Sequence, residues 1–117
     1  MHDPREPSPT SRRFDLVIFD LDGTLVDTLA DIAAAMNSVL AARGFPTHTV
    51  EAYKTMVGDG ALVLAQRTLP PAEAATAGLA EACAREYSLQ YRAIGHGLAR
   101  PYDGIVALLD GLRALGV

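Results

Sequence analysis

Two aspartates, Asp20 and Asp22, offer the clearest chemistry in the sequence. In an extended chain, side chains two residues apart point the same way, so both carboxylates can face one site. Two carboxylates at close range repel each other, and a divalent cation relieves that repulsion. Mg²⁺ typically binds to a few carboxylates together with water and substrate phosphate. The spacing therefore predicts Asp20 and Asp22 as ligands of a Mg²⁺ ion.

The same aspartates and the residues around them suit the chemistry of a phosphate ester. One carboxylate can attack phosphorus to give an aspartyl-phosphate, and the other can serve as general acid and base. The backbone N–H groups of Leu21, Asp22, Gly23 and Thr24 can hold phosphate oxygens in a tight turn. We therefore predict Asp20 and Asp22 as catalytic residues and the four turn residues as a phosphate-binding group.

A strand followed by helices is expected to position these residues. Residues 14–19 form a continuous run of mostly apolar, β-branched and aromatic residues, typical of a strand buried on both faces of a parallel sheet. Sites in open α/β sheets lie beyond the carboxyl ends of strands, where Asp20 and Asp22 fall. Apolar residues at helical spacing and Gly or Pro stops then predict five helices. They run from Thr28 to Gly44, with Asp31 completing a capping box, from Thr47 or Thr49 to Gly58, from Gly60 to Leu69, from about Ala72 to Ile94, and from Ile105 to Leu115.

The predicted strand has no partner in this chain. A lone strand leaves two open edges, so either residues 14–19 are not a strand or the rest of the sheet lies in sequence outside this chain.

Composition excludes several classes of protein. The 117 residues carry a net charge of −4, which argues against the basic face of a general nucleic-acid binder. No apolar run approaches the ~20 residues of a membrane span, and the N-terminus lacks the apolar region of a signal peptide. The single cysteine cannot form an intrachain disulfide. We therefore expect a cytoplasmic protein that binds neither nucleic acid nor membrane.

Three segments together resemble a known family. Residues 19–28, FDLDGTLVDT, are similar to the first motif of the haloacid-dehalogenase superfamily phosphatases. Residues 57–60, VGDG, resemble a loop in the cap domain of phosphoglycolate phosphatases. Residues 100–104, RPYDG, with the leucine-rich helix behind them, resemble the return from cap to core. The resemblance covers about residues 14–117 and corresponds to the N-terminal part of such an enzyme.

The resemblance implies a role for each matching residue. Asp20 would be the nucleophile and a Mg²⁺ ligand. Asp22 would protonate the leaving alkoxide and then activate water, with its backbone carbonyl on Mg²⁺, while Gly23 and Thr24 shape the phosphate turn. Dehalogenases of the superfamily lack the acid at the position of Asp22, so its presence argues for phosphoryl chemistry.

The loop of residues 57–60 has two interpretations. By resemblance, Gly58, Asp59 and Gly60 would contribute to substrate choice from the cap. Alternatively, Gly58 and Gly60 simply end one helix and begin the next.

The implied fold is α/β, with a Rossmann-like parallel-sheet core that carries an inserted α-helical cap. Only the first strand and one helix of the core would be present here. We expect a disordered leader over residues 1–13, the first core strand and catalytic loop over 14–27, the helical cap over 28–98, and a return linker and core helix over 99–117.

The implied activity is Mg²⁺-dependent hydrolysis of a small phosphorylated metabolite such as 2-phosphoglycolate. A sugar-phosphate mutase or another phosphatase of the superfamily, and a non-catalytic remnant acting as an interaction module, are the alternatives. The family's later Ser or Thr, Lys and acidic pair have no match here, because Lys54 is the only lysine and precedes the return segment. Without those groups, phosphate charge stays unbalanced. We therefore expect the chain by itself to have little or no activity.

Overall fold

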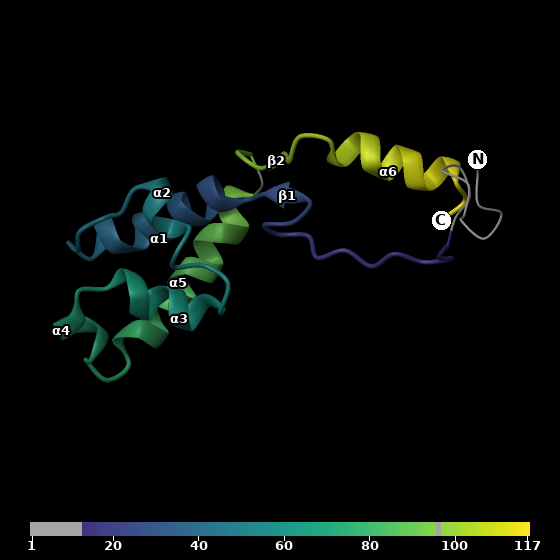
Figure 1. Cartoon of the computed structure of the whole chain (residues 1–117). Coiled ribbons are helices and arrows are strands. Elements are labelled where there is room, and N and C mark those ends of the chain that lie inside the picture. The colour runs from purple at the N-terminus through teal and green to yellow at the C-terminus, as the bar shows by residue number, and fades with distance from the viewer. Residues whose placement is uncertain (1–12, 96) are drawn as a thin grey trace. The chain divides into compact units, whose positions relative to one another are not determined.

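The computed structural model describes residues 13–95 and 97–117 (Figure 1). The chain divides into two compact units. One is the helical unit, residues 28–99, and the other, the terminal unit, combines the chain up to residue 27 with residues 100–117. The leader predicted over residues 1–13 lies outside the described residues, except for Arg13.

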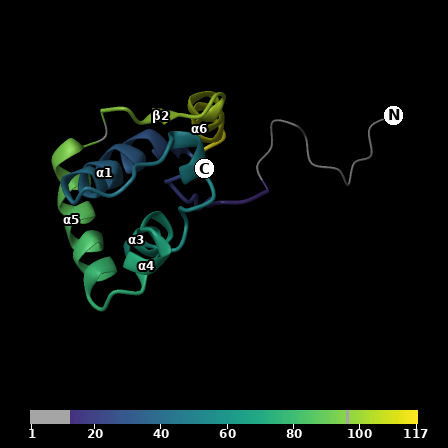
Figure 2. The same ribbon diagram turned by 90° about the vertical axis from the view of Figure 1, so that its left-hand side faces the viewer.

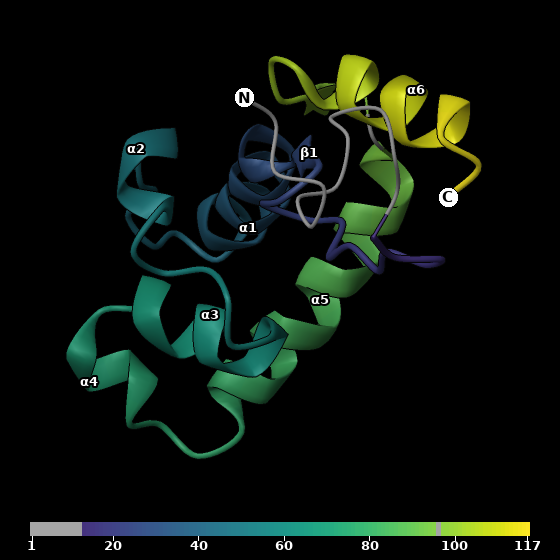
Figure 3. The same cartoon turned by 45° about the vertical axis from the view of Figure 1, so that its right-hand side comes forward.

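The helical unit packs around one long helix, α5. Its helices are α1 (Leu29–Ala42), α2 (Val50–Tyr53), α3 (Ala61–Thr68), α4 (Pro71–Ala74) and α5 (Leu79–Ile94). Helix α5 packs against both α1 and α3, as the views in Figures 2 and 3 show. None of the helices in the described ranges is long and apolar enough to cross a membrane.

The core of the helical unit combines apolar side chains with one buried tyrosine. Its largest fully buried members are Tyr53, Met36, Leu40 and Cys83. Burial, with a smaller contribution from the charge of Tyr87, raises the pKa of Tyr53 to about 12. Burial also raises the pKa of the Cys83 thiol, so Cys83 acts as a small packing residue and not as a nucleophile.

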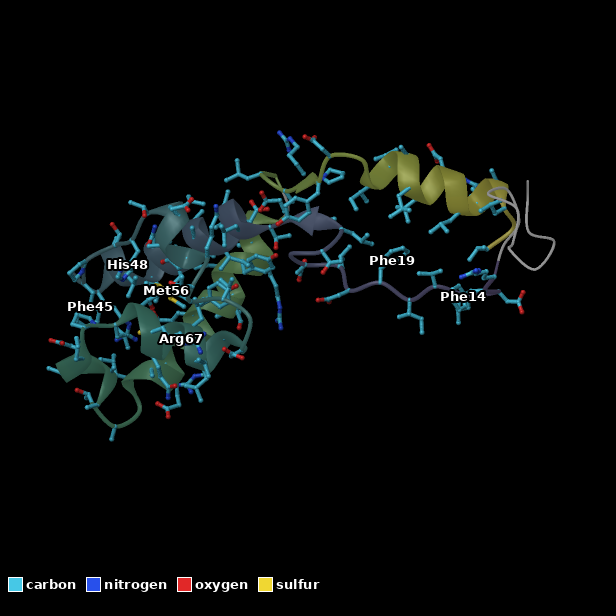
Figure 4. All side chains as sticks on the ribbon, viewed as in Figure 1. Phe14, Phe19, Phe45, His48, Met56 and Arg67 are labelled. Atoms are coloured by element: carbon cyan, nitrogen blue, oxygen red, sulfur yellow. The ribbon has the colours of Figure 1, made fainter. Side chains whose placement is uncertain are left out.

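A polar network beside this core joins α1, the segment after it and α3. The Asn37 side-chain amide donates to the His48 carbonyl at 2.7 Å, and its oxygen accepts from the His48 backbone N–H at 3.0 Å and from the Tyr53 hydroxyl at 2.6 Å. The Nε2 atom of His48 (labelled in Figure 4) lies 2.8 Å from the Thr68 carbonyl oxygen. A carbonyl can only accept, so Nε2 carries the proton.

Several helix boundaries follow the local signals in the sequence. Helix α1 ends before Gly44, which adopts a φ of 76°. Thr49 caps α2 by accepting the Ala52 N–H at 3.2 Å. Pro71 occupies the first turn of α4, and Gly60 is the N-cap of α3. These predictions are confirmed.

The single helix predicted from Ala72 to Ile94 is wrong, because the structure has two helices there. Helix α4 ends at Ala74 and α5 begins at Leu79. Gly78 between them has a φ of 79°, in the left-handed region. Glycine is a poor residue for a helix interior and adopts this conformation readily, so the chain turns before α5 begins.

The predicted capping box is also wrong. Thr28 is the N-cap of α1, but its side chain makes no capping hydrogen bond. Instead of reaching back to Thr28, the fully buried Asp31 accepts the Leu98 backbone N–H through Oδ1 at 3.1 Å. Within the described residues, the Oδ2 atom of Asp31 has no hydrogen-bond partner. Asp31 therefore ties the first turn of α1 to the end of the helical unit.

Replacing Asp31 by alanine should release the Leu98 amide. Loss of this part-buried hydrogen bond should destabilise the chain by about 0.5–1.5 kcal/mol, so the melting temperature should fall and the Leu98 N–H should exchange faster. Amide exchange followed by NMR measures this directly. Asp31→Asn is the matched control, because it keeps a carbonyl oxygen at the position of Oδ1 and should retain protection. Equal Leu98 exchange in the wild type and Asp31→Ala would contradict this role.

An ion pair between Arg43 and Glu86 links the end of α1 to α5, and it should make stability depend on pH. Nε of Arg43 donates to Oε2 of Glu86 at 3.1 Å, and a second guanidinium nitrogen, Nη2, pairs with Oε1. The hydrogen bond from Arg43 lowers the pKa of Glu86. Stability from a lowered carboxyl pKa is present above the unfolded value of ~4.3 and is lost as pH falls through the folded value.

Arg43→Met should therefore destabilise the chain at pH 7 but not in acid. Both side chains are partly exposed, at 31% and 44%, so the expected loss is below ~1 kcal/mol. Urea denaturation of the wild type and the variant at pH 7 and pH 3 measures it. A difference of the same size at both pH values would show that Arg43 acts through packing and not through its charge.

The terminal unit contains two very short strands and one helix. Strands β1 (Val26–Asp27) and β2 (Arg100–Pro101) pair antiparallel, with Val26 opposite Pro101 and Asp27 opposite Arg100. The Tyr102 N–H extends this pairing by donating to the Leu25 carbonyl at 3.1 Å. Helix α6 (Ile105–Ala114) follows, close to the prediction of 105–115.

Residues 14–19 do not form the predicted strand. Within the described part of the chain, β1 and β2 are the only strands. Phe14, Leu16 and Ile18 are 70%, 72% and 86% exposed, and the segment carrying Phe14 and Phe19 is drawn without an arrow in Figure 4. A strand requires a ladder of hydrogen bonds to a neighbouring strand, and neither of the strands in the described residues pairs with this segment. Residues 14–19 therefore have a composition that favours a strand, but in the described part of the chain they belong to no sheet.

Candidate functional site

Asp20 and Asp22 lie in a tightly folded loop that we call the aspartate loop, residues 20–26. The Leu21 carbonyl oxygen accepts three backbone N–H groups, those of Thr24 at 3.3 Å, Leu25 at 3.0 Å and Val26 at 3.1 Å. The Gly23 N–H donates to the Val26 carbonyl at 2.9 Å. Gly23 has a φ of 76°, which favours glycine over any other residue. The loop is thus folded by its own backbone.

Both aspartate side chains are exposed at this loop. Asp20 accepts the Leu21 N–H through Oδ1 at 3.1 Å, which fixes one carboxylate oxygen next to the backbone. Asp22 pairs with Val26 in an isolated bridge, so its backbone is held while its carboxylate faces solvent. The two carboxylates are therefore accessible to a cation or a substrate from solution.

The predicted phosphate-binding amides are largely used within the loop. Leu21, Gly23 and Thr24 donate their N–H groups to acceptors inside it. Among the described residues, no acceptor is seen for the Asp22 N–H or the Thr24 hydroxyl. Of the predicted phosphate-binding groups, these two donors are the ones not already used in a described hydrogen bond.

The donor set of the loop fits the protein's share of a magnesium site. Mg²⁺ usually takes one or two carboxylates and completes its shell with water and phosphate. Asp20 and Asp22 supply two exposed carboxylates. No group of three or more His, Cys, Asp or Glu side chains that could hold a metal occurs among residues 13–95 and 97–117.

The predicted specificity residues Gly58, Asp59 and Gly60 belong to the helical unit, in a segment that we call the glycine loop, residues 57–60. Gly58 and Gly60 have φ values of 118° and 90°. Gly60 is also the N-cap of α3, so the interpretation of the glycines as helix boundaries is confirmed for Gly60. The Asp59 carboxylate pairs with Arg67, at 2.7 Å between Oδ2 and Nη2. The glycine loop and the aspartate loop lie in different units.

Arg67 is a residue of this region that the sequence reasoning missed. It lies in the last turn of α3 and also donates from Nη1 to the Met56 carbonyl at 3.1 Å. Its signal in the sequence is faint: an arginine and an aspartate at opposite ends of one short helix. Only the fold shows that the two meet.

Comparisons with known proteins match most of the chain to one family. The sequence profile of the haloacid dehalogenase-like hydrolase family matches residues 17–117. A phosphoglycolate phosphatase from Agrobacterium fabrum is 40% identical over 104 residues, which are 87% of this chain and 44% of that protein. Phosphoglycolate phosphatase 1 from Pseudomonas aeruginosa is 39% identical over 114 residues, 96% of this chain and 42% of that protein. The chain thus spans less than half the length of these curated relatives.

A solved structure has a similar fold. The crystal structure of a protein described as a predicted phosphoglycolate phosphatase from Haemophilus somnus matches with a TM-score of 0.76 and 33% identity. The match covers 90% of this chain and 49% of that one. The predicted fold class, a partial Rossmann-like α/β core with a helical cap, is confirmed at the level of the family, although the strand expected at residues 14–19 is not formed. The chain belongs to the haloacid dehalogenase-like hydrolase family.

Proposed function

We propose that this chain supplies the nucleophile and the general acid–base residue of a phosphomonoester hydrolase. The proposed substrate is a small phosphorylated metabolite such as 2-phosphoglycolate, which is the substrate named for its relatives. One observation carries the proposal. The exposed Asp20–Asp22 pair lies in a loop folded by its own backbone, within the segment that matches the hydrolase family.

The proposed reaction assigns one carboxylate to each task. Asp20 attacks phosphorus through a carboxylate oxygen, and the ester oxygen leaves with a proton from Asp22. Water then loses a proton to Asp22 and attacks the aspartyl-phosphate, which releases phosphate and restores Asp20. The Asp22 N–H and the Thr24 hydroxyl would bind phosphate oxygens. Mg²⁺, held by the Asp20 carboxylate and the Asp22 backbone carbonyl, would offset negative charge on the phosphate.

The proposed division of labour follows the two units. Residues 14–27 and 99–117 would belong to the catalytic core, and residues 28–98 would form a cap that contributes to substrate choice through Gly58, Asp59 and Gly60. The observed units support this proposal, with the second boundary one residue later, because the helical unit spans residues 28–99. We propose a cytoplasmic location because the one cysteine, Cys83, is buried and forms no disulfide.

Two alternatives are tested alongside this proposal. A sugar-phosphate mutase or a different phosphatase would use the same aspartate loop with another substrate. A non-catalytic interaction module is favoured by one observation: the only lysine, Lys54, forms an ion pair with Glu51 at 3.0 Å in the helical unit. The only lysine therefore belongs to a different unit from Asp20 and Asp22.

A chimeric enzyme tests the proposal. In it, this chain replaces the matching segment of the Agrobacterium fabrum relative, so that the rest of the relative supplies the remaining core. We expect the chimera to release phosphate from 2-phosphoglycolate with Mg²⁺ and to lose activity in EDTA. We expect residues 1–117 alone to show little or no turnover. A chimera that folds by circular dichroism but hydrolyses no phosphomonoester would contradict the proposal and favour the interaction module.

A further inference from the structure

The glycine loop lacks backbone features that would hold it in one shape. Gly58 and Gly60 both adopt positive φ, and glycine populates many other conformations nearly as well. The backbone hydrogen bonds of this region hold only its ends, where the Val57 N–H donates to Tyr53 at 3.1 Å and the Leu64 N–H donates to Gly60 at 3.0 Å. The conformation between these ends therefore depends on side-chain contacts.

Arg67 supplies contacts on both sides of Gly58. Its Nη1 atom donates to the Met56 carbonyl at 3.1 Å, and its Nη2 atom pairs with the Asp59 carboxylate at 2.7 Å. Arg67 and Met56 are labelled in Figure 4. A guanidinium group is planar, and its donors have a fixed spacing. One rigid group thus sets the distance between the two ends of the Gly58 turn.

The ion pair also changes the charge that the loop presents. An unpaired Asp59 would repel a phosphomonoester, which carries about two negative charges near neutral pH. The positive charge of Arg67 offsets that carboxylate. A loop that contributes to the choice of an anionic substrate therefore needs Arg67 for its charge as well as for its shape.

We propose that Arg67 is the positioning residue of the glycine loop: it holds the loop's conformation and neutralises Asp59, so that substrate selection depends on a residue outside the loop. This inference rests on the proposed function. It goes beyond it by naming a residue of α3 that acts through Asp59 and the Met56 carbonyl. The competing interpretation is an exposed surface ion pair, since the Arg67 and Asp59 side chains are 39% and 58% exposed. Such pairs often contribute little.

Hydrogen exchange of the 117-residue chain tests the first part. Arg67→Met should speed exchange of the amides of residues 57–60 severalfold while the core of α1 and α5 stays protected. Arg67→Lys keeps the charge but not the fork of donors, so it should restore only part of the protection. Arg85→Met, which removes an exposed arginine from α5, is the matched control and should leave the loop unchanged. Unchanged loop exchange in Arg67→Met would overturn the proposal.

Kinetics of the chimera test the second part. Arg67→Met should raise KM for 2-phosphoglycolate about fivefold, the size expected for one exposed charge pair, with kcat nearly unchanged. The variant Asp59→Asn should shrink the effect of Arg67→Met, because the two residues act as a pair. A KM equal to that of the Arg85→Met control would overturn the role in selection. An inactive wild-type chimera would count against the proposed function, and loop exchange would then decide the positioning role alone.

Discussion

Replacing Asp20 by asparagine should lower kcat for phosphate release by the chimera by roughly 10⁴- to 10⁶-fold. This is the loss seen when a covalent nucleophile is removed. An amide oxygen is a poor nucleophile and carries no negative charge for Mg²⁺. The measurement is phosphate release from 2-phosphoglycolate at saturating substrate. The matched control is Asp110→Asn, which removes an exposed aspartate from α6 in the same unit and should keep full activity.

The structure separates this chemical effect from loss of fold. Asp20 is exposed, and its one described contact is the Leu21 N–H on Oδ1. Asparagine keeps an oxygen there, so Asp20→Asn should change the free energy of unfolding by no more than ~0.5 kcal/mol. An inactive variant with wild-type stability would support a chemical role. Substantial residual activity would show that another group attacks phosphorus.

An acid quench identifies the attacking group itself. Wild-type chimera quenched during turnover should carry phosphate on Asp20, as an acyl phosphate that hydroxylamine releases. Asp20→Asn should carry none. Phosphate on a serine, threonine or histidine would contradict the proposed mechanism even if Asp20→Asn were inactive.

The local parts of this fold could be predicted from the sequence. Gly44, Thr49, Gly60 and Pro71 mark helix ends through φ preference or capping, which act within a few residues. The break before α5 is not predicted because the alanine-rich residues 72–77 favour helix, whereas the positive φ of Gly78 turns the chain. Local signals therefore place helices well and joins between helices less well.

The long-range contacts could not be predicted from spacing. Asp31 has the position of a capping-box residue, yet it binds Leu98, at the far end of the helical unit. Residues 14–19 have the composition of a strand, but a strand also needs a neighbour, and composition does not supply one. In both cases the sequence pattern indicated a local structure, and the presence or absence of a tertiary partner determined whether that structure formed.

The candidate site shows the same division. The types and spacing of Asp20 and Asp22 suggest their chemistry because the two carboxylates are close along the chain, and their catalytic roles stay a prediction. The hydrogen bonds of the aspartate loop were not predictable in this way, since three amides converge on the Leu21 carbonyl only in its folded form. The role of Arg67 was not predictable for the same reason, because its partner Asp59 lies before the start of α3 and Arg67 lies in the last turn.

Replacing Asp22 by asparagine should slow turnover by about 10²- to 10⁴-fold, the usual contribution of general acid–base catalysis. The variant keeps the nucleophile Asp20 and the backbone carbonyl of residue 22. It loses only the group that gives a proton to the leaving oxygen and takes one from water. Its rate should therefore depend on the leaving group in a way that the rate of Asp20→Asn does not.

An aryl phosphate makes this difference visible. p-Nitrophenolate leaves without needing a proton, so Asp22→Asn should still form the aspartyl-phosphate from p-nitrophenyl phosphate. It should then fail to hydrolyse it quickly, because no base activates water. Acid-quenched Asp22→Asn should thus accumulate more phosphate on Asp20 than the wild type with p-nitrophenyl phosphate, and little with 2-phosphoglycolate. Equal and low labelling with both substrates would mean that Asp22 acts before the covalent step, as a metal or phosphate ligand, and not as the acid and base.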